Sequence, residues 1–481
     1  MEEKFRPKSN KSSRKSIPKY INKATPASKS SKCSPSALKA KMAQLVLKES
    51  KNKIPAQIDP VPKPIVLQSH HRRAKSDPVP SSPYTHPKKP VKVTKCLKKP
   101  ANPPKSSQSS SKSHRRTHSD SDTLKKTASS LLTTATEEQE RTDLIHSIKQ
   151  SFTKGLSFTT TLDFYKLGKP LGKGAFGKVY LGIHKLSGLK VAVKTIEKSF
   201  MQDERTRKKV FQEVYIMNKI HDKNVIRLLE LFESPKHLMI VLEYAGGGDL
   251  LQLLRTRGKL QESEARPIFK QIIDAVQACH KEDIIHRDIK LDNILLNEEL
   301  TLIKLCDFGV SRVAKRGVKL TEQCGTPAYL APEIIVNEGY EAFFVDVWSM
   351  GILLYALMSA TVPFKAKTVP ELHKIILRGK YEFPEYFSEE TKGFIAEMLN
   401  PVPHLRIKLE DLKKHHWFLG EVLENSFHST SGSVKPGRHA EISKEIEGFG
   451  FPRDYVQASL KNREINHATA SYNLLDINML D

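Results

Sequence analysis

The chain has 481 residues, which at roughly 100–200 residues per domain allows two to four domains. Residues 1–130 contain 31 basic and 7 acidic residues, a net charge of +24, so only +2 (26 − 24) of the total +26 falls on the remaining 351 residues. No apolar run approaches the roughly 20 residues of a membrane-spanning helix, and the five cysteines are an odd number without close pairs. These features argue against a membrane-spanning protein, a disulfide framework and a structural zinc site. We expect a reducing compartment, the cytoplasm and also the nucleus.

Residues 1–135 form a basic leader rich in Pro, Ser and Lys, and 16 of the 28 prolines lie before residue 131. A segment with so few apolar residues cannot bury enough surface to offset the entropy lost on ordering, so we expect it to be disordered, with at most a transient helix at 37–47. The Lys-rich tract 88–99 would attract a polyanion, such as nucleic acid, a cytoskeletal surface or anionic lipid. The near absence of aromatic residues argues against sequence-specific nucleic-acid recognition.

Two serines of the leader follow an arginine by three residues. Arg73 precedes Ser76 in RRAKSDP, and Arg116 precedes Ser119 in RRTHSD. Both sequences are typical of sites for a kinase that reads Arg at position −3, and phosphoserine-reading adaptors would be the partners of the modified sites. The alternative is that Arg and Ser are merely common in this segment.

We expect a linker at 136–163. From residue 164, apolar and β-branched residues alternate between Gly-rich turns, which predicts three short strands. The first turn has the pattern GxGxxG, at Gly172, Gly174 and Gly177. A dinucleotide-binding fold uses the same spacing but continues into a helix, whereas a second strand follows here, so we expect a hairpin whose tip covers phosphates. Lys194 ends the third strand, and Glu213 lies in a predicted helix from which it could hold that lysine against the phosphates.

Three further motifs follow the Gly-rich turn and the lysine along the chain. The sequence HRDIKLDN lies at 286–293, DFG at 307–309 and APE at 331–333. In order and spacing, this series resembles the eukaryotic protein kinase family over residues 164–418. The resemblance implies an α+β, two-lobed protein kinase fold, with a small, mostly antiparallel β lobe that includes one helix and a large, mostly helical lobe. Lys290 and the GTP sequence at 325–327 resemble Ser/Thr rather than Tyr kinases.

The resemblance also implies residue roles in ATP- and Mg²⁺-dependent phosphoryl transfer. Asp288 would orient the substrate hydroxyl, Lys290 would stabilise the transferring group, and Asn293 and Asp307 would ligate magnesium. The residues expected to bind ATP are Leu171, Gly172, Gly174, Gly177, Val179, Ala192, Lys194, Glu213, Glu243, Ala245, Asp249, Leu295 and Asp307. Asp249 and Asp292 are expected to bind an Arg at position −3 of a protein substrate; alternatively, Asp249 serves only the ribose and Asp292 only faces solvent.

The activation segment departs from the family pattern. Relatives commonly carry a phosphorylated threonine two residues before the sequence CGTP, and Glu322 occupies that position here. A glutamate would give Arg287 a permanent negative partner, so activity would not need an upstream kinase. The alternative is phosphorylation of the neighbouring Thr321. Thr326 belongs to the GTP sequence that would face the substrate residue after the phosphorylated one.

Beyond a polar linker at 419–437, residues 438–476 predict three short helices. We expect Pro452 in the first turn of the second helix and Asn466 as the N-cap of the third. The turn GFGFP at 448–452 resembles that of the ubiquitin-associated fold. About 40 residues are marginal for independent stability, so we expect this module to dock on the kinase domain. A kinase domain followed by such a module resembles the AMP-activated-kinase-related (sucrose-nonfermenting type) branch of the calmodulin-kinase group.

The sequence therefore predicts an active Ser/Thr kinase that phosphorylates protein substrates. Two alternatives stay open. A catalytically weak kinase-fold scaffold would usually lack Lys194, Asp288 or Asp307, all of which are present. In the other alternative, the basic leader tethers the kinase to a polyanion or to the cytoskeleton.

Overall fold

The computed structural model describes residues 120–156, 160–174, 177–419 and 437–479. The helix expected at 37–47, the Lys-rich tract and both Arg-x-x-Ser sequences lie outside these residues. Within the described chain, 140–479 belong to one structural unit and 120–139 to another. None of the described helices is both long enough and apolar enough to cross a membrane.

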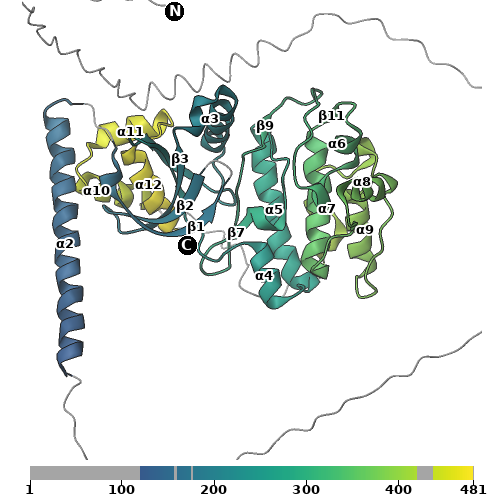
Figure 1. Ribbon diagram of the computed structural model, residues 1–481, viewed down its shortest axis with the longest axis horizontal. Coiled ribbons are helices and arrows are strands. Elements are labelled where there is room, and N and C mark those ends of the chain that lie inside the picture. The colour runs from purple at the N-terminus through teal and green to yellow at the C-terminus, as the bar shows by residue number, and fades with distance from the viewer. Residues whose placement is uncertain (1–119, 157–159, 175–176, 420–436, 480–481) are drawn as a thin grey trace, which may run out of the picture. The chain divides into compact units, whose positions relative to one another are not determined.

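A five-stranded antiparallel sheet forms the small lobe, in the order β1-β2-β3-β5-β4 (Figure 1). The strands are β1 Tyr165–Lys173, β2 Gly177–His184, β3 Lys190–Glu197, β4 Leu228–Glu233 and β5 His237–Glu243. Between β3 and β4 lies helix α3 (Glu204–Lys219), whose N-cap Asp203 accepts a hydrogen bond from the backbone N–H of Thr206 at 2.9 Å. The cap satisfies one of the donors that the first turn leaves unpaired.

The two faces of this sheet pack against different parts of the chain. In the β2–β3 ladder Val179 pairs with Lys194, and cross-strand partners point to the same face. The neighbouring Val191 and Val193 point to the opposite face, where they are fully buried in a core shared with the C-terminal helices. The Val191 face is therefore covered, by a segment far away in the sequence, whereas the Lys194 face stays partly exposed.

The large lobe is mostly helical. Helix α7 is buried nearly all round, as expected from its apolar sequence, and forms the centre of the lobe. Three two-stranded ladders line the side that faces the small lobe and the activation segment: β6–β9, β7–β8 and β10–β11. The helices are α4 Leu250–Arg257, α5 Glu262–Lys281, α6 Pro332–Val336, α7 Phe343–Ser359, α8 Val369–Arg378 and α9 Glu389–Met398. The strands are β6 Ile284–Ile285, β7 Ile294–Leu296, β8 Ile303–Leu305, β9 Arg312–Val313, β10 Lys319–Leu320 and β11 Tyr340–Glu341. The predicted fold class is confirmed.

Two buried charged groups fix the large lobe. Arg406 makes a two-pronged ion pair with Glu333, with nitrogen–oxygen distances of 2.8 and 3.0 Å. Asp346 accepts hydrogen bonds from the backbone N–H groups of His286 and Arg287, at 3.0 and 2.8 Å. Burial raises the pKa of Asp346, but the hydrogen bond from His280 and the charges around it outweigh this and leave the pKa below its usual value. Asp346 thus anchors the catalytic loop as a carboxylate.

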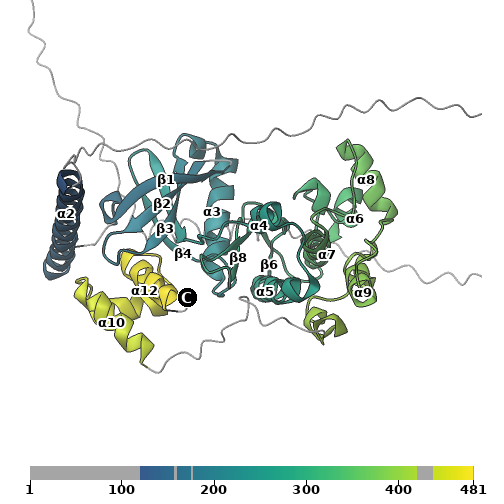
Figure 2. The same cartoon turned by 90° about the horizontal axis from the view of Figure 1, so that it is seen from below.

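The tail module contains the three expected helices, α10 (Arg438–Gly448), α11 (Arg453–Lys461) and α12 (His467–Asn478). Asn466 caps α12 as predicted, by accepting a hydrogen bond from the backbone N–H of Thr469 at 3.0 Å. Pro452 occupies the N-cap position of α11, one residue before the expected place. Helix α12 packs against β4 (Figure 2), so the module docks on the small lobe as expected.

The segment before the kinase domain differs from the prediction. Helix α2 (Asp120–Thr153) covers the end of the region expected to be a disordered leader and most of the expected linker at 136–163. Its long first part has few apolar residues, which is why the composition predicted no structure. The apolar residues near its end, from Leu144 to Phe152, pack in a core completed by Phe451, which lies about 300 residues later in the chain.

Candidate active site

The Gly-rich turn joins β1 to β2. A Cβ atom on Gly177 would lie only 1.7 Å from the backbone oxygen of Thr195, so no other residue fits there. A Cβ atom at Gly172 would meet nothing within 4 Å, whereas one at Gly174 would lie 3.8 Å from the backbone oxygen of Gly177 and 4.0 Å from Cε of Lys194. Leu171 lies near the end of β1 with 41% of its side chain exposed. The backbone here can approach a phosphate closely.

Lys194 is held in place by a glutamate of α3. Its Nζ atom lies 2.6 Å from Oε1 of Glu213, and the two side chains are only 16% and 7% exposed. The lysine comes from the centre of the sheet, and the glutamate from the buried face of the helix. The pair predicted from the sequence is therefore formed.

An apolar surface lies on the same face of the sheet as Lys194. Its members share one property: each is partly exposed, whereas the residues on the other face of β3 are fully buried. On the sheet they are Val179, Ala192 and Leu242. Ala245, just after β5, and Leu295, on β7 of the large lobe, are also partly exposed. An incompletely covered apolar surface next to a positioned cation fits the flat adenine ring and the phosphates of ATP.

Asp288 accepts four hydrogen bonds. Oδ2 accepts from Lys290 Nζ at 2.7 Å and from the amide of Asn293 at 3.1 Å. Oδ1 accepts from the backbone N–H and the hydroxyl of Thr326, at 2.9 and 2.7 Å. Burial raises the pKa of Asp288, but the hydrogen bonds from Lys290 and Thr326 outweigh it and hold the pKa below its usual value. Asp288 is therefore ionised at neutral pH and able to accept a hydrogen bond from an alcohol.

The two predicted magnesium ligands lie at the ends of neighbouring strands. Asn293 precedes β7, Asp307 follows β8 by two residues, and the N–H of Cys306 donates to the carbonyl of Asn293 at 2.9 Å. The amide nitrogen of Asn293 donates to the carbonyl of Asp288, which leaves its oxygen as the atom able to ligate a metal. Asp307 is exposed, with its φ of 64° in the left-handed region. Carboxylate and amide oxygens are ligands that Mg²⁺ accepts.

The rest of a magnesium coordination shell would have to come from the nucleotide and from water. In the described residues no group of three or more His, Cys, Asp or Glu side chains is arranged to hold a metal. His286, next to the catalytic loop, is fully buried, and its ring meets Phe308 edge to face at 5.0 Å. We therefore assign His286 to packing and not to proton transfer.

Glu322 of the activation segment bridges two arginines. Its carboxylate lies 3.0 Å from Arg287 Nη1 and 2.6 Å from Arg312 Nη2. Arg312 also donates to the side chain of Gln212 at 3.0 Å, and Gln212 is the residue before Glu213 on α3. A chain of polar contacts thus runs from the activation segment to Gln212 on α3, the helix that carries the glutamate paired with Lys194. Thr321, by contrast, is exposed.

The two aspartates expected to recognise substrate lie on adjoining elements. Asp249 is the N-cap of α4 and accepts from the backbone N–H of Gln252 at 2.8 Å. Asp292 lies on the short 3-10 helix Leu291–Asn293, and its side chain is exposed. Helix α4 packs against this 3-10 helix. The capping bond uses one oxygen of Asp249, a role that the sequence analysis did not foresee.

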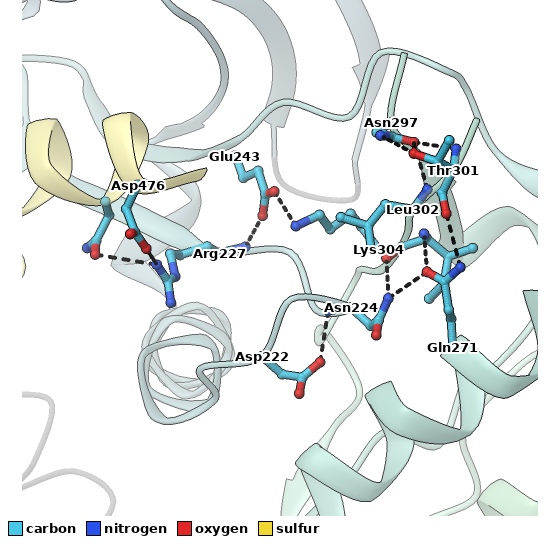
Figure 3. Close-up of polar contacts among 12 residues, drawn as sticks. Asp222, Asn224, Arg227, Glu243, Gln271, Asn297, Thr301, Leu302, Lys304 and Asp476 are labelled. Carbon is cyan, nitrogen blue, oxygen red and sulfur yellow. Dashed lines mark hydrogen bonds and ion pairs between the residues drawn. The ribbon is translucent and has the colours of Figure 1, made fainter. Parts of the chain in front are cut away.

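Glu243 is the one predicted ATP-binding residue whose side chain faces away from the nucleotide surface. Its carboxylate forms a buried ion pair with Lys304 of β8, and it accepts from the N–H of Arg227 at 3.1 Å (Figure 3). Only the backbone of Glu243 is thus placed to contact adenine. Arg227 continues the network to the tail, where its Nη1 lies 3.7 Å from Asp476 and 3.5 Å from Asn473. The sequence analysis missed Lys304, although a lysine within an apolar strand was a signal.

The sequence matches the protein kinase domain family over residues 165–418, more than half of the chain. The chain belongs to the protein kinase family. ATP and Mg²⁺ are the standard cofactors of this family, and the residues described above fit both.

Named relatives include "SNF1-related protein kinase catalytic subunit alpha KIN12" of Arabidopsis thaliana, 37% identical over 319 residues, which are 65% of this chain and 63% of that one. "Serine/threonine protein kinase OSK3" of Oryza sativa is 37% identical over 325 residues, 67% of this chain and 64% of the other. The matches span less than two thirds of the length of these relatives. The predicted resemblance to the sucrose-nonfermenting branch is confirmed.

We expect Lys304→Met to destabilise this kinase much more than Lys190→Met. Lys304 and Glu243 are 7% and 4% exposed, so removing the lysine leaves a buried carboxylate without its partner, at a cost of about 3 kcal/mol or more. Lys190 forms a matched ion pair with Glu298 at 2.6 Å, but both side chains are about half exposed, and such pairs contribute about 0–1 kcal/mol. Urea unfolding of the two variants measures the difference; equal losses would contradict the assigned role of the buried pair.

Proposed function

We propose that this protein is an ATP- and Mg²⁺-dependent kinase that phosphorylates serine and threonine hydroxyls of protein substrates. The observation that carries the proposal is the simultaneous presence of two arrangements. Lys194 is paired with Glu213, and Asp288 is held as a carboxylate by Lys290 and Thr326. The first would position phosphates and the second an alcohol, so a scaffold without activity has less support.

Phosphoryl transfer requires mainly positioning and charge neutralisation. ATP supplies the phosphoryl group when bound, with Mg²⁺ to neutralise its charge. Lys194 would hold phosphate oxygens, and Asp307 with the amide oxygen of Asn293 would hold the metal. Asp288 would accept a hydrogen bond from the substrate hydroxyl. This bond would orient the hydroxyl oxygen for attack on the phosphoryl group. Lys290, 2.7 Å from Asp288, would stabilise negative charge on the transferring group.

The contact of Thr326 with Lys290 at 2.9 Å supports an aliphatic hydroxyl as the acceptor. The threonine contacts both Lys290 and Asp288, the two residues that resemble the catalytic pair of Ser/Thr kinases. The sequence motifs favour the same class of acceptor, a serine or threonine hydroxyl.

We further propose that Glu322 replaces an activating phosphate. A phosphorylated residue would bring two negative charges to Arg287, and Glu322 supplies one permanent charge at 3.0 Å. Through Arg312 and Gln212 the same charge supports α3. The kinase would then be active without an upstream kinase acting on Thr321.

Two further parts of the proposal concern the leader. Its net charge of +24 supports contact with a polyanion or with the cytoskeleton. Ser76 and Ser119, each three residues after an arginine, support autophosphorylation by a kinase that reads Arg at position −3, and recognition by phosphoserine adaptors.

We expect Asp307→Asn to reduce kcat by at least about 100-fold, because the metal loses a charged ligand at the position where negative charge develops. Transfer from labelled ATP to a Ser peptide in the presence of Mg²⁺ measures this. Asp411→Asn is the matched control, since this exposed aspartate forms a surface ion pair with Lys414 and is not part of the site. Activity of Asp307→Asn near the wild-type value would refute the assignment of Asp307.

Glu322→Gln should lower kcat about three- to tenfold. The substitution removes the charge but keeps the shape, and it weakens two partly exposed ion pairs, each of which contributes up to about 1 kcal/mol. Thr321→Ala should leave kcat unchanged, and so should treatment of the wild-type protein with a phosphatase. If Thr321→Ala or phosphatase treatment abolishes activity instead, an upstream kinase is required and the proposal for Glu322 is wrong.

The kinase should prefer peptides with Arg at position −3. A guanidinium bound by Asp249 and Asp292 gains charge-assisted hydrogen bonds of about 1–3 kcal/mol, which corresponds to roughly 5–150-fold in kcat/KM. Comparison of matched peptides with Arg or Ala at −3 measures the preference. Asp292→Asn should reduce it, and Asp249→Asn provides a second test in which asparagine can still cap α4. Equal kcat/KM for the two peptides in the wild-type protein would end this hypothesis.

A further inference from the structure

The last part of α2, residues 140–153, contacts two segments that lie far from it in the sequence. One is the turn of the tail module between α10 and α11, residues 449–452. The other is the turn between β2 and β3 of the small lobe, residues 185–189. Apolar side chains of all three segments belong to one buried core, whose members include Ile148, Leu186 and Phe449.

The contact between α2 and the tail turn is close enough to require glycine. Gly450 has a φ of +94°, and a Cβ atom added there would lie 2.9 Å from Cγ of Lys149 and 3.2 Å from the carbonyl oxygen of Ile145. The helix backbone therefore lies directly on the turn. Ile148 is fully buried at this point.

Aromatic rings extend the same contact by one turn of the helix. The ring of Phe152 packs edge to face against Phe451 at 6.1 Å and against Tyr455 of α11 at 4.9 Å between ring centroids. Together, Leu144, Ile145, Ile148 and Phe152 recur at helical spacing, so this part of α2 has a single apolar face, and the tail module covers it.

One arginine of α2 touches both of the other segments. Arg141 Nε donates to the backbone oxygen of Leu186 at 2.8 Å, and its guanidinium lies 5.6 Å from the centre of the Phe449 ring. The neighbouring Glu140 forms an ion pair with Lys185 at 2.9 Å. These polar contacts fix where α2 lies along the small lobe, while the apolar ones hold the tail.

The tail module has a second attachment to the small lobe, which α2 does not make. His467 is fully buried; its Nδ1 atom lies 2.8 Å from Oε2 of Glu230 on β4, and its Nε2 atom lies 3.2 Å from Nε2 of His184 on β2. A polar interface of this kind is sensitive to small displacements, because each buried group loses its partner when the module moves. The module is also small, so it depends on its neighbours for stability.

We propose that residues 140–153 of α2 are a clamp that completes the tail module as a fourth helix and fastens it to the small lobe. The module then stays docked only while this helix is seated, and any event that removes the helix, such as a partner that binds its apolar face, releases the tail. The proposal does not depend on the substrate or on the activity.

Hydrogen–deuterium exchange of the full-length protein tests the clamp. Ile148→Asp places a charge in the buried contact, and we expect exchange in α10, α11 and α12 to accelerate at least tenfold. Exchange in α5 and α7 of the large lobe should not change, which shows that the kinase domain stays folded. Ser147→Asp is the matched control. It adds the same charge to the same helix, one residue before Ile148, where the side chain is exposed. It should leave the tail as in the wild type.

Two milder variants distinguish loss of the clamp from general misfolding of the protein. Phe152→Ala removes the ring that packs on Phe451 and Tyr455. Arg141→Ala removes the contacts with Leu186 and Phe449 without removing an apolar side chain from the core. Each should accelerate exchange in α10 to α12 about threefold or more. If the tail exchanges at the wild-type rate in Ile148→Asp and in both milder variants, α2 does not clamp the module and the proposal is wrong.

Discussion

Successive side chains of β3 point to opposite faces of the small-lobe sheet, and each face serves a different part of the molecule. Ala192 and Lys194 point toward the nucleotide surface, and Lys194 is paired there with Glu213 of α3. Val191 and Val193 point toward the opposite face, where they are fully buried in the core that the small lobe shares with the tail module. Because successive side chains of a strand alternate between its two faces, the same few residues of β3 serve both. Catalytic geometry and tail docking therefore share one backbone.

A second constraint joins the lobes through charge. Glu322 of the activation segment holds Arg287, next to the catalytic aspartate, and Arg312, which contacts α3 through Gln212. The buried pair of Glu243 and Lys304 ties the end of β5 to β8, which ends two residues before Asp307, the proposed metal ligand. Both connections join the small lobe to the large lobe, but they differ in exposure. Glu243 and Lys304 are only 4% and 7% exposed, whereas Glu322 is 40% exposed, so the buried pair is the one that salt screens least.

The sequence was informative where function requires residues at fixed spacing. The pairing of Lys194 with Glu213 and the capping by Asn466 follow from local rules, and both are present in the structure. Helix α2 was not predicted, because its only apolar face is short and the residues that cover it come from the other end of the chain. Lys304 is a lysine within an apolar strand, which is a local signal, but its partner Glu243 lies on a different lobe, and no local pattern identifies that partner.

The docked tail also has a consequence for the order in which the protein can fold during synthesis. The match to the kinase family ends at residue 418, whereas the residues that cover Val191, Val193 and Glu230 begin only after 437. While the ribosome is still adding the tail, this face of the sheet lacks the part of its cover that the tail supplies, and Glu230 on the edge strand β4 has Thr160 and Tyr165 as partners but not His467. Expression of 165–418 alone would leave the same apolar surface exposed permanently.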